Sequence, residues 1–350
     1  MKTTMKKIVI ERPGGYRRLQ IKEFPTPAPR NSEVLIEVSA AGVNFADVFI
    51  RLGLYKSAKE FVGWPVTPGF EFAGKVIGRG RDVSDLAEGT PVFGVTLFGA
   101  YASHLCVPRQ QVFSIAQDSK FSTDQWASVP AVFLTAYHGL FQNIVLRPGM
   151  KILVHSAAGG VGGALLQLGK IAGCFMVGVV GAGHKVAAAH KYGADFVIDK
   201  SSQNLWAKAG EICPNGYDVV FDANGPDTLK QSYRHLASSG KLVSYGFHSM
   251  LSRRKGLPNY FKLAYQYFRI PRWSPLNMTN ENKSLIAFNL SYLFNRMDLL
   301  KESMQDLIKW IEEGKIQAPD LQCFPFEKVA DAHRALESGN TVGKLVLKFN

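Results

Sequence analysis

The middle of the chain carries its clearest pattern of apolar and polar positions. Residues 152–154 form a continuous apolar run, typical of a strand buried on both faces, and a helical segment opens at residues 164–168. A second apolar run covers residues 175–180. Glycines lie between the first run and the helix, where the chain must turn sharply. The pattern predicts a βαβ unit with a glycine-rich turn.

The alternation of strands and helices continues beyond this unit. The periodicity predicts helices at about 184–192 and 227–236, and strands at 196–198, 218–221 and 241–245. Strands that alternate with helices are typical of a parallel sheet, so the fold class is α/β with a doubly wound Rossmann sheet.

The first third of the chain has a different pattern. Short apolar or alternating runs at 7–11 and 33–40 are separated by a proline-rich turn, and glycines interrupt further runs between 69 and 99. These features predict a small β-barrel-like domain that extends to about Phe121. A helical pattern with one internal proline, Pro130, follows at 124–141.

The glycine turn has the spacing of a dinucleotide-binding fingerprint. Ala157-x-Gly159-x-x-Gly162 matches G-x-G-x-x-G with its first glycine replaced by alanine. The start of the following helix offers free N–H groups and the positive end of its dipole to a pyrophosphate. The residues expected to contact the cofactor here are Ala157, Ala158, Gly159, Gly160, Val161 and Gly162.

The end of the second strand predicts which dinucleotide binds. An NAD site places an acid there for the ribose hydroxyls, whereas an NADP site provides a cation for the 2′-phosphate. This strand ends at Val180-Gly181 without a carboxylate, and Lys185 follows. We therefore expect NADPH, although Lys185 also fits a solvated lysine at a helix start.

Composition limits the class of protein. A chain of 350 residues with 46% hydrophobic and 20% charged residues predicts a folded protein of two domains. The N-terminus has no signal-peptide pattern. Four scattered cysteines form no CxxC pair, which predicts a cytoplasmic protein without disulfides or structural zinc. The histidines lack HExxH spacing, and no GxSxG or P-loop is present, so hydrolase and kinase functions are set aside.

Positive charge is concentrated in one region. The net charge is +13, and residues 228–280 contain nine Lys or Arg and no acid. Within 252–273, Arg253-Arg-Lys255 precedes a helical pattern with Phe261, Tyr265 and Phe268 on one face and cations on the other. Such a helix suits an anionic membrane, an active-site cover or a dimer contact. We expect an active-site cover or a dimer contact rather than a membrane role, and no nucleic-acid partner, because no binding module accompanies the charge.

Several motifs together resemble a known family. The chain is similar to the zinc-independent quinone oxidoreductases of the medium-chain dehydrogenase/reductase superfamily, and most similar to homologues of vesicle amine transport protein 1 (VAT-1). The residues that carry the resemblance are 41–47 (AGVNFAD), 68–71 (PGFE), 133–137 (FLTAY), 154–162 (VHSAAGGVG), 326–332 (FEKVADA) and 343–348 (GKLVLK).

The resemblance implies an architecture and an activity. It implies a GroES-like catalytic domain split between residues 1–126 and 291–350, and a Rossmann NADP-binding domain at 127–290. It also implies NADPH as cofactor, a quinone or activated enone as substrate, and a homodimer.

The resemblance also predicts the absence of a catalytic metal. Zinc members of the superfamily have a cysteine where Asn44 stands and a histidine where Phe70 stands. Glu71 remains, but one carboxylate does not hold a catalytic zinc ion. Without a Lewis acid, alcohol oxidation loses a contribution of several kcal/mol. Reduction of quinones or conjugated carbonyls, which accept hydride readily, is the chemistry left.

The family pattern nominates further site residues. Asn44 and Tyr55 match positions that line the substrate pocket, where they can donate hydrogen bonds to an oxygen that gains charge. Tyr55 fits equally an ordinary half-buried aromatic, and we expect Asp47 to order its loop. The cofactor residues implied are Thr135, Lys200, Asn224, Tyr245, Gly246, Phe247, Phe288 and Leu290.

Two functions are compatible with the sequence. One is an NADPH-dependent quinone or enone reductase. The other is a membrane-associated or lipid-handling protein that keeps NADPH as a structural ligand.

Overall fold

The computed structural model describes residues 4–251 and 256–349, and the chain forms two compact units. Unit 1 comprises Met1–Leu134, Arg254–Leu257 and Leu290–Asn350, and unit 2 comprises Thr135–Arg253 and Pro258–Asn289. Chain segments from both ends of the sequence therefore share unit 1. The domain boundaries expected from the sequence, 126/127 and 290/291, stay a prediction.

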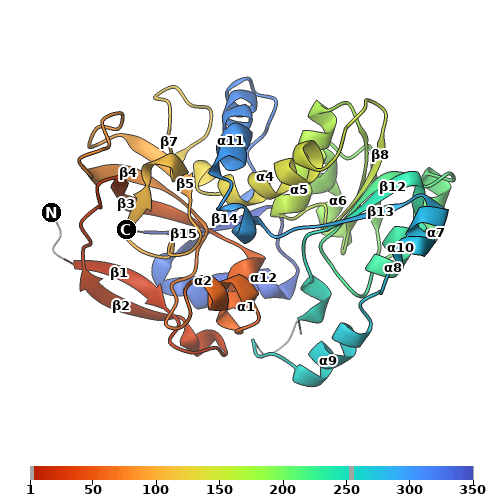
Figure 1. The fold of residues 1–350 in the computed structure, drawn as a ribbon, viewed down its shortest axis with the longest axis horizontal. Coiled ribbons are helices and arrows are strands. Elements are labelled where there is room, and N and C mark those ends of the chain that lie inside the picture. Colours follow the sequence, from red (N-terminus) through yellow and green to blue (C-terminus); the bar gives the residue numbers. More distant parts are fainter. Residues whose placement is uncertain (1–3, 252–255, 350) are drawn as a thin grey trace. The chain divides into compact units, whose positions relative to one another are not determined.

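Unit 2 contains one parallel sheet of six strands in the order β10-β9-β8-β11-β12-β13 (Figure 1). Numbered along the chain, this is the 3-2-1-4-5-6 order of a Rossmann sheet, so the predicted fold class is confirmed. The order reverses between β8 and β11, and ligands bind at the carboxyl ends of such strands. The strands are β8 (Lys151–His155), β9 (Phe175–Val180), β10 (Phe196–Asp199), β11 (Tyr217–Asp222), β12 (Leu236–Ser244) and β13 (Ser284–Ala287).

Helices connect these strands. They are α5 (Gly160–Ile171), α6 (Val186–Lys191) with the 3₁₀ turn η4 (Gly183–Lys185), α7 (Leu205–Ile212) and α8 (Leu229–Arg234). Side chains of α7 and α8 pack with the strands in one buried cluster that includes Leu153 and Val220. Burial on both faces explains why these strands have continuous apolar sequences.

Unit 1 is built mainly from β-strands. A seven-stranded sheet has the order β14-β15-β3-β4-β5-β7, with β6 paired to β3, and β1 and β2 form a separate antiparallel pair. The strands are β1 (Thr4–Val9), β2 (Gln20–Pro25), β3 (Glu33–Val43), β4 (Glu71–Arg79), β5 (Pro91–Val95), β6 (His104–Pro108), β7 (Val112–Ser114), β14 (Leu321–Pro325) and β15 (Lys344–Lys348). The prediction of a β-rich domain split in sequence is confirmed.

The helices of unit 1 lie in both of its sequence segments. They include α1 (Phe45–Arg51), α2 (Lys56–Phe61), α3 (Thr123–Trp126), α11 (Met297–Glu312), α12 (Val329–Ser338) and the short 3₁₀ turns η1 (Tyr16–Arg18), η2 (Arg109–Gln111), η6 (Leu290–Leu293) and η7 (Phe326–Lys328). The helix α4 (Pro130–Tyr137) begins at Pro130 and continues into η3 (His138–Gln142). Proline is favoured in the first turn of a helix, where its missing N–H costs no bond.

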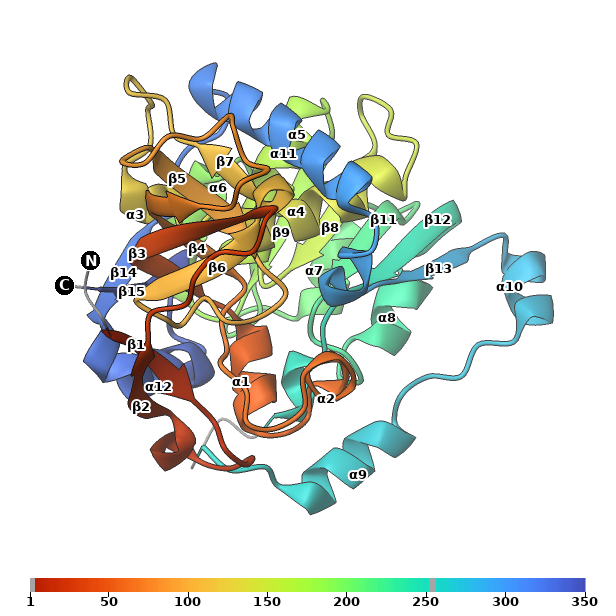
Figure 2. The ribbon, with the colours of Figure 1, turned by 60° about the vertical axis from the view of Figure 1, so that its left-hand side comes forward.

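Between β12 and β13, the chain of unit 2 forms η5 (His248–Met250), α9 (Tyr260–Phe268) and α10 (Pro275–Glu281). An extended segment joins α9 to α10 (Figure 2). The predicted basic triplet 253–255 lies outside the described residues. Within the described ranges, no helix combines the length and the apolar character needed to cross a membrane.

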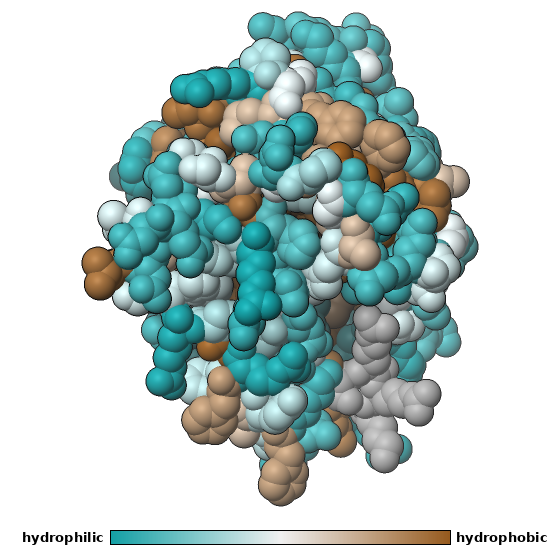
Figure 3. All heavy atoms as spheres, turned by 90° about the vertical axis from the view of Figure 1, so that its right-hand side faces the viewer, coloured by the Kyte–Doolittle hydropathy of each residue, from teal (hydrophilic) through white to brown (hydrophobic). Residues whose placement is uncertain are grey.

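The aromatic face of α9 is exposed in the single chain, so the expected active-site cover or dimer contact stays a prediction. Phe261 and Phe268 are 92% and 77% exposed. The opposite, polar face is bonded to unit 2: Gln266 and Arg269 both donate to Asp227 Oδ1, at 3.0 and 2.9 Å. Figure 3 shows apolar side chains, coloured brown, exposed among hydrophilic ones on the face that it draws. The polar face of α9 is turned inward because the carboxylate of Asp227 binds it.

Candidate active site

The glycine turn after β8 has the geometry of a phosphate-binding loop. A Cβ on Gly162 would lie 2.2 Å from the carbonyl oxygen of Ser156, so only glycine fits there. Ala157 is buried, and a Cβ on Gly178 of β9 would lie 2.9 Å from its methyl group. Ala157 stands where the fingerprint has its first glycine. Because Gly178 has no side chain, it leaves room for the methyl group of Ala157. The left-handed residue is instead Ser156, at φ 56°.

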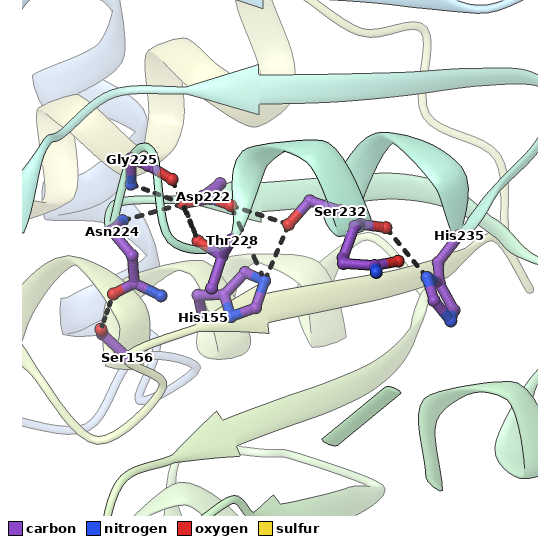
Figure 4. A network of polar contacts seen from close by, with 9 residues as sticks. His155, Ser156, Asp222, Asn224, Gly225, Thr228, Ser232 and His235 are labelled. Carbon is purple, nitrogen blue, oxygen red and sulfur yellow. Dashed lines mark hydrogen bonds and ion pairs between the residues drawn. The ribbon is translucent and has the colours of Figure 1, made fainter. Parts of the chain in front are cut away.

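A buried polar network joins this turn to the end of β11 (Figure 4). The Asp222 carboxylate accepts hydrogen bonds from the backbone N–H groups of Asn224 and Gly225, and from the hydroxyls of Thr228 and Ser232, at 2.7–3.1 Å. Ser156 Oγ donates to Asn224 Oδ1 at 3.2 Å. The network holds the two turns that flank the switch point of the sheet.

His155 belongs to the same network and is a core residue. Its Nε2 lies 3.0 Å from Ser232 Oγ and 3.9 Å from Asp222 Oδ2. Burial lowers the pKa of His155, so the imidazole is neutral at pH 7. Serine, histidine and aspartate also form hydrolase triads, but all three side chains here are fully buried, so no substrate reaches the serine.

The end of β9 is flanked by both a cation and a carboxylate. Lys200, which follows β10, has its Cε 3.7 Å from the position a Cβ on Gly181 would take. Asp199 Oδ2 lies 3.4 Å from the corresponding position on Gly183, and Asp199 Oδ1 accepts two bonds from Ser201. Asp199 was not predicted, although Lys200 beside it was, and although the ends of neighbouring parallel strands meet at one edge.

The remaining cofactor candidates of unit 2 gather at the carboxyl ends of β11, β12 and β13. A Cβ on Gly225 would lie 2.8 Å from the Phe247 ring, and Tyr245 stacks on Phe288 with ring centroids 6.4 Å apart. Phe288 also contacts His138, whose ring centroid lies 4.7 Å away. Thr135 precedes His138 by three residues, which places it on the same side of the α4–η3 helix. Leu290, in contrast, is the first residue of η6 and belongs to unit 1.

In unit 1, strand register brings three polar side chains to one corner of the sheet. Leu345 of β15 pairs with Val43 of β3, and Ala41 pairs with Phe72 of β4. Lys344, Asn44 and Glu71 therefore stand side by side at adjacent strand ends. This corner contains the predicted catalytic residue Asn44.

The three side chains form a closed set of contacts. Lys344 Nζ lies 2.6 Å from Glu71 Oε1 and donates to Asn44 Oδ1, while Asn44 Nδ2 donates to Glu71 Oε1 at 2.8 Å. Glu71 Oε2 accepts from the backbone N–H of Ala131 at 2.7 Å. A Cβ on Gly42 would lie 2.3 Å from Glu71 Oε1, so the glycine makes room for the carboxylate.

These residues do not fit a zinc ion. Asn44 and Phe70 replace two donors of the zinc members, and the one remaining carboxylate, Glu71, is paired with Lys344. A protonated lysine has no lone pair to offer a metal. The described parts of the chain contain no cluster of three His, Cys, Asp or Glu side chains suited to a metal.

Asp47 supports the loop around Asn44, as predicted. Its carboxylate accepts from the backbone N–H groups of Asn44 and Gly69, both at 2.8 Å, and from Tyr101 Oη at 3.0 Å. Burial nevertheless raises the pKa of Asp47 to about 6. Gly69 has φ 99° and a Cβ there would meet Tyr101, so this turn requires glycine.

Tyr55 lies in the same unit beside an aromatic cluster. Its hydroxyl is 2.9 Å from Ser291 Oγ, and its ring packs edge-on against Phe70 at 5.9 Å. Tyr55 is therefore a half-buried aromatic with a polar partner, and its catalytic role stays a prediction. Ser291 had no sequence signal, and Lys344 lies within the motif 343–348, which gave it no role in the site.

Comparisons with known proteins agree with this architecture. A model of the zinc-binding dehydrogenase family matches residues 192–347, and a model of the alcohol dehydrogenase GroES-like domain matches residues 30–117. The human synaptic vesicle membrane protein VAT-1 homologue is 32% identical over 336 residues, which are 95% of this chain and 84% of that protein.

Two solved structures have the same fold. Escherichia coli quinone oxidoreductase complexed with NADPH is 29% identical, with a TM-score of 0.83 over 98% of this chain and all of that one. CurK enoyl reductase is 25% identical, with a TM-score of 0.85 over 99% of each chain. The Rossmann sheet, its glycine turn and these similarities assign a nicotinamide cofactor to unit 2. The chain belongs to the VAT-1 homologue family, within the medium-chain dehydrogenase/reductase superfamily of oxidoreductases.

Proposed function

We propose that the protein reduces quinones or activated enones with NADPH and without zinc. The observation that carries the proposal is the corner of unit 1, where Asn44 stands in place of a metal ligand and Lys344 is paired with the carboxylate of Glu71. Such a corner can donate a hydrogen bond but cannot bind a Lewis acid. Substrates that accept hydride without a metal suit it best.

In this proposal, the cofactor supplies the hydride and the protein positions and polarises the substrate. Asn44 uses one amide hydrogen on Glu71, and its second hydrogen donates to the substrate oxygen that gains negative charge. Tyr55 donates a second bond through its hydroxyl. The turn at Gly162 accepts the pyrophosphate, because no side chain blocks its backbone.

A substrate panel tests the reaction. NADPH oxidation should be measurable with quinones and conjugated enones and absent with simple alcohols or saturated ketones. Treatment with a chelator should leave the rate unchanged, and elemental analysis should show no stoichiometric zinc. Failure to oxidise NADPH with any quinone or enone would refute the proposed activity.

The preference for NADPH over NADH rests on Lys200 and Lys185. Lys200 approaches Gly181 at the end of β9, and Asp199 is held by Ser201. Lys200→Ala and Lys185→Ala should each narrow the difference between the dissociation constants of NADPH and NADH, measured by cofactor fluorescence. Lys208→Ala on α7 is the control and should leave this difference unchanged. If the unmutated protein bound NADPH and NADH with equal affinity, Asp199 would be the residue that binds the adenosine ribose instead.

A second candidate function is favoured by α9, whose aromatic face is exposed. A VAT-1 relative is named a vesicle membrane protein. We propose that this face binds an anionic membrane surface. Residues 228–280 have nine cations and no acid, a charge that repels a second copy of the same surface but attracts anionic lipid.

Liposome co-sedimentation separates these roles. Phe261→Ser with Phe268→Ser should abolish binding to vesicles that contain phosphatidylserine, as should glutamine at 253–255, and added salt should weaken it. Val145→Ser removes an equally exposed apolar side chain elsewhere in unit 2 and should have no effect. If the variants instead change the oligomer size or the Michaelis constant, α9 is a dimer contact or a substrate cover.

A further inference from the structure

Lys344 takes part in the candidate active site although no family motif assigns it a chemical role. It is the first residue of β15, and its side chain is only 3% exposed. Lysine is almost never fully buried unless it is paired. Its partners here are Glu71 and the side-chain oxygen of Asn44.

The pattern of donors fixes the orientation of the Asn44 amide. Lys344 can only donate, so it requires the oxygen of Asn44, and the Glu71 carboxylate can only accept, so it requires the nitrogen. A flipped amide would place oxygen against carboxylate and nitrogen against ammonium. One hydrogen of Asn44 Nδ2 is thereby held in a single direction.

The contact with Lys344 also strengthens that hydrogen as a donor. A cation on the amide oxygen withdraws electron density from the amide nitrogen, and bonds in such chains reinforce one another. Zinc members of the superfamily place a metal cation in this corner, and here the only formal positive charge among its three partners is the ammonium of Lys344.

We propose that Lys344, together with Glu71, is a positioning residue that takes the electrostatic place of the metal by orienting and polarising the Asn44 amide toward the substrate oxygen. This inference rests on the proposed function. The occupant of the corner is therefore a fixed ammonium–carboxylate pair, and the group that contacts the substrate is Asn44.

The test removes the charges of Lys344 and Glu71, once in the unmutated protein and once in an Asn44→Ala background, and compares the effects on kcat. Lys344→Met alone leaves Glu71 buried without its cation, and such a variant can fail to fold. The double variant Lys344→Met with Glu71→Gln removes both charges and keeps similar volumes. It should lower kcat for a quinone by about tenfold or more, while the NADPH dissociation constant, set in unit 2, is unchanged.

In an Asn44→Ala background, the same double substitution should produce no further loss of kcat, because the pair acts through Asn44. Lys348→Met removes a lysine from the same strand, where it pairs with Asp124 at the surface, and should leave kcat unchanged. A folded double variant with unaltered kcat would overturn the inference, as would an equal loss in the Asn44→Ala background. An unmutated protein that reduces no quinone or enone would refute the proposed function itself.

Discussion

Each unit buries a carboxylate at the end of a strand, but the two carboxylates are stabilised differently. Glu71 in unit 1 and Asp222 in unit 2 are both fully buried. Glu71 is compensated by one cation, Lys344, together with an amide and a backbone N–H. Asp222 has no cation within hydrogen-bond distance among the described residues and is held by four neutral donors.

The difference separates two tasks. Four donors from one turn and one helix fix the backbone around Asp222, which suits a rigid support for the cofactor turn. A single ammonium concentrates charge beside Asn44, which suits a site that polarises a substrate. The first arrangement tolerates the loss of one member, whereas the second does not.

The largest effect is expected for Lys344→Met. Loss of this cation leaves the buried Glu71 charge unpaired, so the free energy of unfolding should fall by about 3–5 kcal/mol. Urea denaturation measures it, and Lys348→Met should stay within about 1 kcal/mol. A small effect of Lys344→Met would show that Glu71 is not held by its cation.

A smaller loss is expected for Ser232→Ala. Asp222 keeps three donors and His155 Nε2 loses its partner Ser232, so the free energy of unfolding should fall by about 1.5–3 kcal/mol, mainly from the bond to the charged carboxylate. The same denaturation experiment applies. If Ser232→Ala lowered the free energy of unfolding as much as Lys344→Met, the two carboxylates would not differ in how they are stabilised.

The comparison extends to the buried imidazoles. His155 in unit 2 has Ser232 as a hydrogen-bond partner. His333 in unit 1 has no hydrogen-bond partner among the described residues, and burial lowers the pKa of His333 to about 3. The unfolded chain binds a proton below pH 6.5 and the folded one does not, so His333 costs stability as pH falls from 6.5 towards 3.

His333→Leu should therefore flatten the acid limb of the stability curve. Between pH 7 and pH 5, the unmutated protein should lose about 2 kcal/mol more than the variant. Denaturant midpoints at the two pH values measure this difference. Identical pH profiles would show that the folded protein accommodates a charged His333.

The smallest effect is expected at Ser156, where the Asp222 network reaches the cofactor turn. Ser156→Ala loses the bond to Asn224 and should cost about 0.5–1.5 kcal/mol. Ser156→Gly loses the same bond but relieves a left-handed backbone worth about 1–2 kcal/mol, so it should be at least as stable as the unmutated protein. Thermal unfolding compares the two variants. Equal losses would show that the backbone at Ser156 is not strained.

Local patterns predicted most of unit 2. The apolar run 175–180 coincides with β9, because a strand buried on both faces needs no alternation. The helix α7 was missed, because its eight residues mix polar and apolar side chains and its start depends on the Asn204 cap, which accepts from Trp206 and Ala207 N–H groups.

The candidate site was predictable only where its residues lie in one motif. The residues of the glycine turn and Asn44 stood out by spacing or resemblance. Lys344 did not, because a lysine that opens an apolar strand is indistinguishable from a surface residue until strand pairing is known. For α9, the composition of each face was predictable, but which face is inward depends on Asp227, which precedes the helix by more than thirty residues.

Strand β15 also affects the order of events during synthesis. Lys344 and Asn44 are 300 residues apart, so at about 5–20 residues per second a ribosome makes them roughly 15–60 s apart. During that interval β3 lacks its neighbour β15, and Glu71 lacks its cation. The parallel sheet of unit 2 is complete well before then. A nascent chain therefore carries an open β-edge in unit 1, and this edge is where a chaperone would be needed.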